Sequence, residues 1–159
     1  MKSSVKLTVN GLEQEHQAEP RTSLLTFLRE QCGLTGSKRG CEEGECGGCS
    51  VLLNGELVTS CLIFALEAQG AQLVTVEGLG TPHHLSPLQE AFATDGASQC
   101  GFCIPGMLLA ATNLLERNPD PNEQDIRKAI SGNLCRCTGY DLIVAAIGKA
   151  AELKKGARG

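Results

Sequence analysis

The chain has 159 residues, of which 42% are hydrophobic and 20% charged, so it is long enough for one globular domain or two small ones. Its formal net charge of -4 argues against a nucleic-acid partner, because neutralising phosphates requires clustered lysine and arginine. No apolar run is long enough to span a membrane, and the N-terminal stretch "MKSSVKLTVNGLEQ" has no apolar signal core. We therefore expect a cytoplasmic protein.

The first predicted elements are two strands and a short helix. Alternating apolar residues at Val5, Leu7 and Val9 indicate a strand. Asn10-Gly11 is typical of a hairpin turn, so "LEQEHQAE" is expected to return as the second strand. Thr22 or Ser23 can then cap a short helix that buries its leucines.

A cysteine-rich segment, "GCEEGECGGC", separates these elements from the rest of the first half. Beyond it, "SVLL" and "ELVTS" flank a second Asn-Gly turn and indicate another hairpin. The stretch "CLIFALEAQG" predicts a helix that ends at Gly70, and "QLVTVE" predicts the last strand. Four or five short strands with one or two helices predict a small α+β domain over residues 1–78.

The second half, residues 79–159, is predicted to be helical after the Gly- and Pro-containing stretch "GLGTPHHLSP". Ser86 before Pro87 is typical of a capped helix start. Asn122 and Asp125 resemble a capping box for a helix that Gly132 would close. With the apolar-periodic segments "PGMLLAATNLLERN" and "YDLIVAAIGKAAELKK", these signals predict four helices, with the cysteines at helix ends and in loops.

Nine cysteines are the most informative feature of the chain. A cytoplasmic chain keeps its thiols reduced, so the pattern favours metal ligation over disulfides. Eight of the nine fall into two groups of four, namely Cys41, Cys46, Cys49 and Cys61, then Cys100, Cys103, Cys135 and Cys137. Cys32 stands alone, and we expect it to act as a small buried hydrophobic residue.

The first group begins with the spacing C-x4-C-x2-C, which is typical of plant-type 2Fe-2S ferredoxins. Four glycines accompany these cysteines and would let backbone N–H groups approach the sulfurs closely: Gly40, Gly44, Gly47 and Gly48. A zinc site is the alternative, but zinc ligands usually come as two short knuckles, and zinc requires no glycine-rich wrap.

The second group has the spacing C-x2-C, a long gap, and then C-x-C within "NLCRCTGY". A single intervening residue is unusual for zinc and suits four loop ligands that converge on one cluster between helices. The two groups together favour an electron carrier with two clusters. A structural zinc protein is the rival interpretation and would be colourless and free of labile sulfide.

Three segments, "GCEEGECGGCSV", "QCGFCIPG" and "GNLCRCTGYDLI", resemble the signature motifs of the iron–sulfur subunit of molybdenum hydroxylases. This is the superfamily of xanthine dehydrogenase, aldehyde oxidase and carbon monoxide dehydrogenase. The resemblance covers nearly the whole chain. It implies an α+β chain with an N-terminal ferredoxin-like β-grasp domain and a following all-α four-helix-bundle domain, each holding a 2Fe-2S cluster.

The resemblance also implies a role for each cysteine in the two groups. The first group would bind the distal cluster, which faces FAD on another subunit, and the second group the proximal cluster, which lies nearer the molybdenum cofactor. Gln99 and Cys137 match positions that contact the pterin of that cofactor. The expected partners are a large molybdenum-pterin subunit and a medium FAD subunit, in a higher-order hetero-oligomer.

The function implied by this resemblance is a one-electron relay, with no catalytic residue on this chain. The substrate of the whole enzyme is expected to be an N-heterocycle, such as a purine, or an aldehyde. A free-standing two-cluster ferredoxin that serves several oxidoreductases is the alternative. His83 and His84 have no third ligand within sequence reach, so we expect an exposed pair and no metal site.

Overall fold

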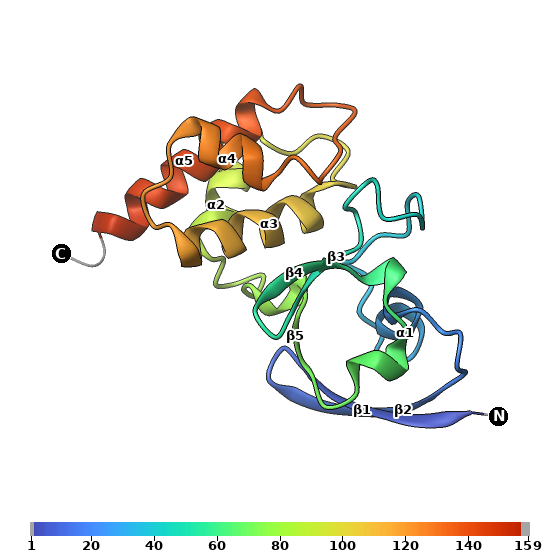
Figure 1. Ribbon diagram of the computed structural model, residues 1–159. Coiled ribbons are helices and arrows are strands. Elements are labelled where there is room, and N and C mark those ends of the chain that lie inside the picture. Colours follow the sequence, from blue (N-terminus) through green and yellow to red (C-terminus); the bar gives the residue numbers. More distant parts are fainter. Residues whose placement is uncertain (1, 157–159) are drawn as a thin grey trace.

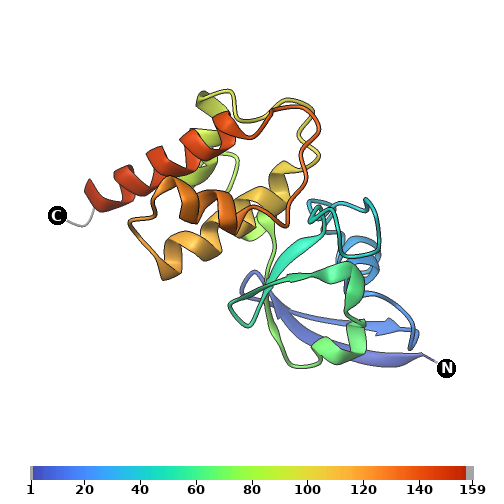
Figure 2. The ribbon, with the colours of Figure 1, turned by 45° about the horizontal axis from the view of Figure 1, so that its top comes forward.

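The computed structural model describes residues 2–156, which form an α+β molecule in two halves (Figure 1). The N-terminal half contains the sheet and the C-terminal half contains most of the helices. Figures 1 and 2 show from two directions that β1 and α5 lie toward opposite ends of the molecule. Among the described residues, no helix is both long enough and apolar enough to cross a membrane.

The sheet has five strands in the order β2-β1-β5-β3-β4. Only the β1–β5 pair is parallel; the other neighbours are antiparallel. Both predicted hairpins are confirmed, and the residues Asn10 and Asn54 that open their turns have φ of 52° and 51°, as such turns require. The strands are β1 Ser3–Val9, β2 Leu12–Ala18, β3 Ser50–Leu53, β4 Glu56–Thr59 and β5 Gln72–Val74.

Helix α1 (Leu24–Glu30) supplies much of the first core. Its N-cap is Ser23, one of the two predicted candidates, and the Ser23 hydroxyl accepts a hydrogen bond from the Thr26 N–H at 3.2 Å. The helix packs its apolar residues against the inward-facing side chains of the strands. The fully buried members of this core include Val5, Leu7, Val9, Leu24, Phe27, Leu28, Val51 and Leu73.

The predicted helix over "CLIFALEAQG" is wrong. The chain instead forms two short 3-10 turns, η1 (Ser60–Leu62) and η2 (Ala65–Ala68), with extended backbone at Ile63 between them. The Ile63 carbonyl accepts from the Leu24 N–H at 2.7 Å, and the Ala65 N–H donates to the Thr22 carbonyl at 2.9 Å. Backbone groups that a helix would have used are therefore bonded to the segment that enters α1.

The second half contains four helices, after a short 3-10 turn η3 (Val76–Gly78) and a loop. The helices are α2 Pro87–Thr94, α3 Ile104–Arg117, α4 Glu123–Ala129 and α5 Asp141–Gly156. The predicted caps at Ser86 and Asn122 are confirmed, each as a capping box. Helix α4 ends at Ala129, before the predicted Gly132, because Ile130 and Asn133 form a turn in which the Asn133 N–H donates to the Ile130 carbonyl.

The helical half has a core of its own, in which α5 packs against α2 and α4. Its largest fully buried side chains are Met107, Ile143 and Ile147. The two halves meet where α3 packs against β3 and β4. There the Asn113 amide donates to the Gly55 carbonyl at 2.9 Å, and Arg117 pairs with Glu56. The domain boundary after residue 78 stays a prediction.

Candidate metal centres

The two cysteine groups lie on loops that meet where the halves join. Cys41, Cys46 and Cys49 are in the long loop between α1 and β3, and Cys61 is in η1. The second group lies at the N-terminal end of α3 and in the loop between α4 and α5. The Leu134 N–H, next to Cys135, donates to the Cys46 carbonyl at 2.9 Å, which brings the two loops into contact.

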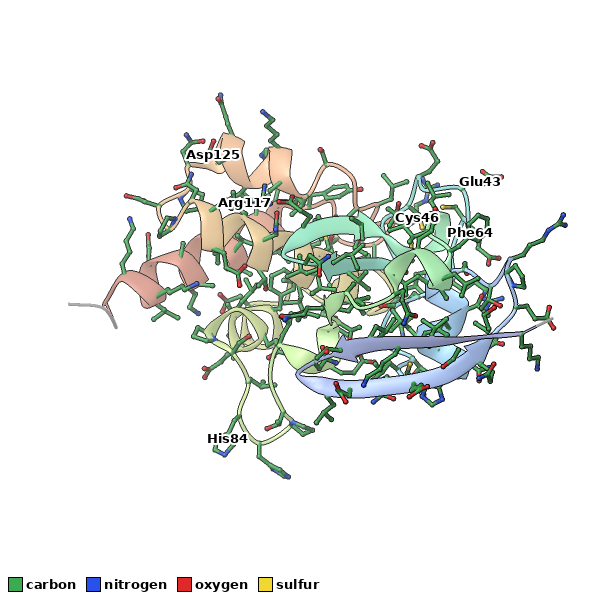
Figure 3. All side chains as sticks on the ribbon, turned by 60° about the horizontal axis from the view of Figure 1, so that its bottom comes forward. Glu43, Cys46, Phe64, His84, Arg117 and Asp125 are labelled. Carbon is green, nitrogen blue, oxygen red and sulfur yellow. The ribbon has the colours of Figure 1, made fainter. Side chains whose placement is uncertain are left out.

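In the first group, backbone N–H groups point at sulfur. The N–H groups of Glu43 and Cys46 each donate to Cys41 Sγ at 3.4 Å, and Figure 3 shows Glu43 and Cys46 on this loop. These bonds lower the pKa of the Cys41 thiol to about 7, since they stabilise the thiolate. Burial, and then the neighbouring Cys49, raise the pKa of Cys61 to about 11. In the first group, Cys41 therefore ionises readily near neutral pH, whereas Cys61 would lose its proton only on binding a metal.

Glycines make room for this arrangement at two positions. A Cβ on Gly40 would lie 2.8 Å from Cys46 Sγ. Gly44 has φ of +82°, and a Cβ there would lie 2.5 Å from Leu62 Cδ1. A side chain at Gly40 would displace the Cys46 sulfur, and one at Gly44 would displace the Leu62 side chain. The glycines therefore leave the space that the loop needs to fold around the thiols, as a bound cluster would require.

The second group contains a similar mixture of ready and buried thiols. Burial raises the pKa of Cys103 to about 12, with a further contribution from the neighbouring Cys135. Burial also opposes ionisation of Cys135, but hydrogen bonds from Thr138 and from the Cys137 N–H outweigh it and lower its pKa to about 7. The pKa of Cys137 is raised, chiefly by its contact with Cys100. Cys103 thus neighbours Cys135, and Cys137 neighbours Cys100.

Thr138 and Tyr140 hold the Cys135 backbone and sulfur in place. The Thr138 hydroxyl donates to Cys135 Sγ at 3.1 Å. The Tyr140 hydroxyl accepts from the Cys135 N–H at 2.9 Å, and the Tyr140 N–H donates to the Thr138 hydroxyl at 3.2 Å. A sulfur that accepts a hydroxyl hydrogen bond is suited to carry negative charge, as a cluster ligand must.

The thiols of each group interact with one another. Within residues 2–156, no three His, Cys, Asp or Glu side chains are close enough together to hold one metal ion. In each group two neighbouring pairs can be recognised: Cys41 with Cys46, Cys49 with Cys61, Cys100 with Cys137, and Cys103 with Cys135. Four cysteine thiolates are the ligand set of a 2Fe-2S cluster, and each group would supply four. The residues present therefore fit a 2Fe-2S cluster in each group.

Gln99 and Cys137, predicted to contact a pterin, both have exposed side chains. Cys100 is also exposed, and Cys137 interacts with it. The three residues therefore lie at or near one surface of the helical half. Exposure is what a contact with another subunit requires, and the pterin contact itself stays a prediction.

The remaining sequence candidates lie apart from these groups. His83 and His84 are exposed in the loop before α2, and Figure 3 shows His84 projecting away from Cys46. Cys32 packs against the first core, and burial raises its pKa to about 11. Cys32 belongs to neither cysteine group, and a half-buried thiol packed against an apolar core behaves as a small hydrophobic residue.

Asn133 is an important residue that the sequence analysis did not single out. Its side chain is only 3% exposed, and its amide bonds to the loop of the other half. Thr138 was missed as well. Both lie within "GNLCRCTGYDLI", the last of the three motifs, so their position inside that motif was the available signal.

Two families cover most of the chain. A family described as a 2Fe-2S iron–sulfur cluster binding domain matches residues 7–75. A second family, described as a 2Fe-2S binding domain, matches residues 75–148. Each matched region contains one of the two cysteine groups.

Several known proteins are similar to the chain over nearly all of its length. It is 48% identical to the nicotinate dehydrogenase small FeS subunit of Eubacterium barkeri, covering 95% of this chain and 96% of that protein. It is 46% identical to the aldehyde oxidoreductase of Megalodesulfovibrio gigas, covering 94% of this chain but only 17% of that longer protein. A solved chain of quinoline 2-oxidoreductase from Pseudomonas putida 86 superposes with a TM-score of 0.93 at 44% identity, covering 98% of this chain and 97% of the other.

Proposed function

This chain belongs to the iron–sulfur subunits of the molybdenum hydroxylase family, and from that premise we propose that it relays single electrons from a molybdenum-pterin subunit to an acceptor. The observation that carries the proposal is the contact between two groups of four cysteines. Each group fits one 2Fe-2S cluster, and the Leu134–Cys46 hydrogen bond joins the α4–α5 loop of one group to the α1–β3 loop of the other. A chain built in this way is suited to pass charge from one loop to the other.

We assign four thiolates to each cluster. The distal cluster takes Cys41, Cys46, Cys49 and Cys61, and the proximal cluster takes Cys100, Cys103, Cys135 and Cys137. When bound, each cluster accepts and releases one electron at a time. The protein's own contribution is to hold the sulfurs in place. N–H groups and the Thr138 hydroxyl stabilise negative sulfur, and the core around Cys49 and Cys103 limits access of water.

We assign the sheet half, residues 1–78, to a ferredoxin-like β-grasp domain, and residues 79–159 to a four-helix bundle. The mixed sheet covered by α1 supports the first assignment, and α2 to α5 around one core support the second. The two family matches meet at residue 75, close to the proposed boundary.

The proposed partners follow from the relatives and from the exposed surface. We assign Gln99 and Cys137 to contact with the pterin on a large subunit, and the distal loop to face a medium FAD subunit, with assembly into a larger hetero-oligomer in the cytoplasm. The relatives are named for nicotinate, nicotine, quinoline and aldehyde chemistry. The proposed substrate class of the whole enzyme is therefore an N-heterocycle or an aldehyde, bound on the partner subunit.

The test combines metal analysis with two matched cysteine variants. The chain is purified anaerobically, and iron, zinc and acid-labile sulfide are measured per chain. Two clusters require four irons and four sulfides. Cys46→Ser should abolish one of the two electron paramagnetic resonance (EPR) signals of the reduced protein, whereas the control Cys32→Ser should retain both.

Three results would contradict parts of this proposal. Zinc without sulfide would overturn both clusters, and an unchanged pair of signals in Cys46→Ser would overturn the ligand assignment. A chain that never copurifies with larger subunits would favour the free-standing ferredoxin.

A further inference from the structure

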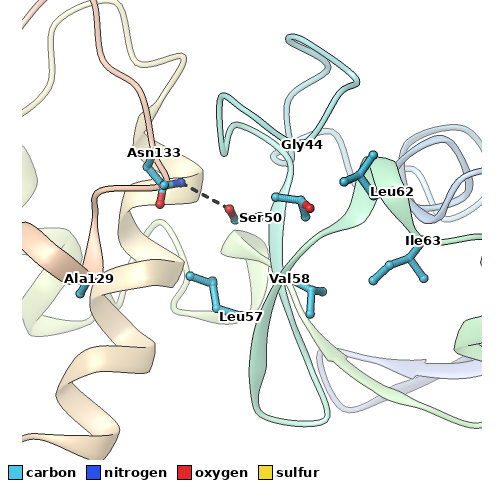
Figure 4. Close-up of a pocket in the computed structure, with 10 residues that line it drawn as sticks. Gly44, Ser50, Leu57, Val58, Leu62, Ile63, Ala129 and Asn133 are labelled. Carbon is cyan, nitrogen blue, oxygen red and sulfur yellow. Dashed lines mark hydrogen bonds between the residues drawn. The ribbon is translucent and has the colours of Figure 1, made fainter.

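Asn133 forms a buried polar bridge between the two halves. Its Nδ2 donates to the Gly47 carbonyl at 2.9 Å and to the Ser50 hydroxyl at 3.3 Å, and Figure 4 shows the bond to Ser50. The side chain lines a groove of about 380 Å³ that has Leu57 on one wall and Ala129 on the other. The amide thus reaches from the α4–α5 loop to the loop that carries Cys46 and Cys49.

The neighbouring backbone makes a second link at the same place. The Leu134 N–H donates to the Cys46 carbonyl at 2.9 Å. Leu134 is covalently joined to Cys135, and Cys46 and Cys135 are assigned to different clusters. A path from one ligand to the other therefore consists of the covalent bonds of three residues and one hydrogen bond.

Glycines allow the α4–α5 loop and α3 to lie close to the loop that carries Cys46. Gly47 has φ of +69°, and a Cβ there would lie 2.3 Å from the Gly132 carbonyl oxygen and 2.5 Å from Asn133 Nδ2. From the other side, a Cβ on Gly106 in α3 would lie 2.3 Å from the Gly47 carbonyl oxygen. A side chain at either glycine would push these segments apart, and the Asn133 amide bonds across the same contact.

We propose that Asn133 is a positioning residue. It sets the spacing between the α4–α5 loop and the loop that carries Cys46, and it thereby keeps the Leu134 N–H within hydrogen-bonding distance of the Cys46 carbonyl. The inference rests on the proposed function, since it concerns transfer between the two clusters. In that transfer one electron leaves the reduced proximal cluster and reduces the oxidised distal cluster, and no bond to a proton or a leaving group changes. Asn133 acts through distance and orientation, without touching either metal.

The Gly47 carbonyl does not need Asn133 to satisfy its hydrogen bonding. It also accepts from the Ser50 N–H at 3.1 Å and from the Ser50 hydroxyl at 2.8 Å, both within its own loop. Removing the Asn133 amide therefore leaves no buried carbonyl unpaired, and the loop retains its internal bonds. The bond from Asn133 serves the contact between the halves, which makes Asn133→Ala an informative variant.

The experiment compares Asn133→Ala with Asn113→Ala in the full chain. Asn113 also donates an amide hydrogen bond to a backbone carbonyl of the other half, but at the β3–β4 turn. For each variant, iron and sulfide are counted, the magnetic interaction between the two reduced clusters is measured by EPR, and electron equilibration between them is followed after flash reduction. We expect Asn133→Ala to weaken the interaction and slow equilibration by about tenfold or more, the effect that small misplacements have on other distance-dependent steps.

The outcomes separate this inference from the proposed function. Full iron and sulfide in both variants, with weaker interaction and slower equilibration only in Asn133→Ala, supports the positioning role. Full clusters with wild-type interaction and rate in Asn133→Ala overturns it and leaves the proposed function intact. If Asn133→Ala loses a cluster, Asn133→Asp decides, because it keeps the shape of the side chain and replaces the donor with a charged acceptor. Wild-type transfer in Asn133→Asp overturns the role, and slower transfer with both clusters present supports it. Absence of clusters from the wild-type chain would overturn the proposed function itself.

Discussion

At the scale of single residues, the structure tunes sulfur with individual hydrogen bonds. The Cys135 sulfur is partly buried, which disfavours its charge, yet its pKa falls to about 7 because hydrogen-bond donors surround it. Cys103, which lacks comparable donors, has its pKa raised to about 12 by burial. The same contrast should appear in the cluster, since a donor to sulfur favours the more negative, reduced state.

Replacing Thr138 with Val removes the hydroxyl that donates to Cys135 Sγ at 3.1 Å. The reduced state of the proximal cluster loses more than the oxidised state, so its reduction potential should fall by on the order of tens of millivolts. A redox titration followed by EPR measures this shift. Thr138→Ser keeps the hydroxyl and is the control. An unchanged potential in Thr138→Val would show that this bond does not tune the cluster.

At the scale of elements, the functional residues lie on loops and turns that are bordered by helices and strands. Helix α4 begins with a capping box at Asn122 and stops at Ala129, so that the following turn presents Asn133 to the other half. Helix α3 begins directly after Cys103 and packs against β3, the strand that follows Cys49. The rigid elements therefore fix where each cysteine loop begins and ends.

Ala variants of Gly47 and Gly33 test the close contact between the loops, because the two glycines have nearly the same backbone conformation but only Gly47 lies in the contact. Their φ values are +69° and +70°, but a Cβ on Gly33 would meet nothing within 4 Å. Both Ala variants carry the cost of a left-handed residue, about 1–2 kcal/mol, and only Gly47→Ala adds a clash with the Gly132 carbonyl. The free energy of unfolding of Gly47→Ala should therefore be lower than that of Gly33→Ala by about 1–3 kcal/mol. A lower midpoint of thermal unfolding measures this difference. Equal midpoints would mean that the loops separate without cost.

At the scale of the whole molecule, the chain consists of two packed halves, and we propose a different partner at each cysteine group. The cores of the two halves are separate, and α3, β3 and β4 join them through packing, the Asn113–Gly55 bond and the Asn133 bridge. Exposed ion pairs such as Arg117–Glu56 add little to this junction, because both side chains are more than half exposed. The apolar residues left on the surface are better indicators of where a partner binds.

Leu142 and Leu153 lie on the same helix, α5, and are similarly exposed, at 45% and 51%. Leu142 neighbours Gly96 in the segment that leads to Gln99 and Cys100, whereas Leu153 lies at the far end of the helix. Leu142→Asp should weaken binding of the molybdenum-pterin subunit by about tenfold or more, because it places a charge in an apolar contact. A tenfold loss of affinity corresponds to about 1.4 kcal/mol. Copurification from the native complex measures it. Equal recovery with Leu142→Asp and Leu153→Asp would contradict a partner at this face.

Local pattern was sufficient to predict the α+β class, both hairpins and most of the helices, whereas the ligand assignment stays a prediction. Both Asn-Gly hairpins, the caps at Ser23, Ser86 and Asn122, and the ends of the long helices depend on neighbours a few residues away, so they can be read from the chain. The two cysteine groups were visible for the same reason, because close spacing and accompanying glycines reflect local geometry.

Only the tertiary structure decided which distant groups meet. The segment from Cys61 to Gly70 has a helical pattern, yet its backbone bonds to Thr22 and Leu24, and these long-range bonds outweigh local propensity. The pairing of Cys103 with Cys135, and the bridge from Asn133 to Gly47, join residues far apart in sequence. Such contacts depend on how two separately formed cores pack together, and no local pattern records that packing.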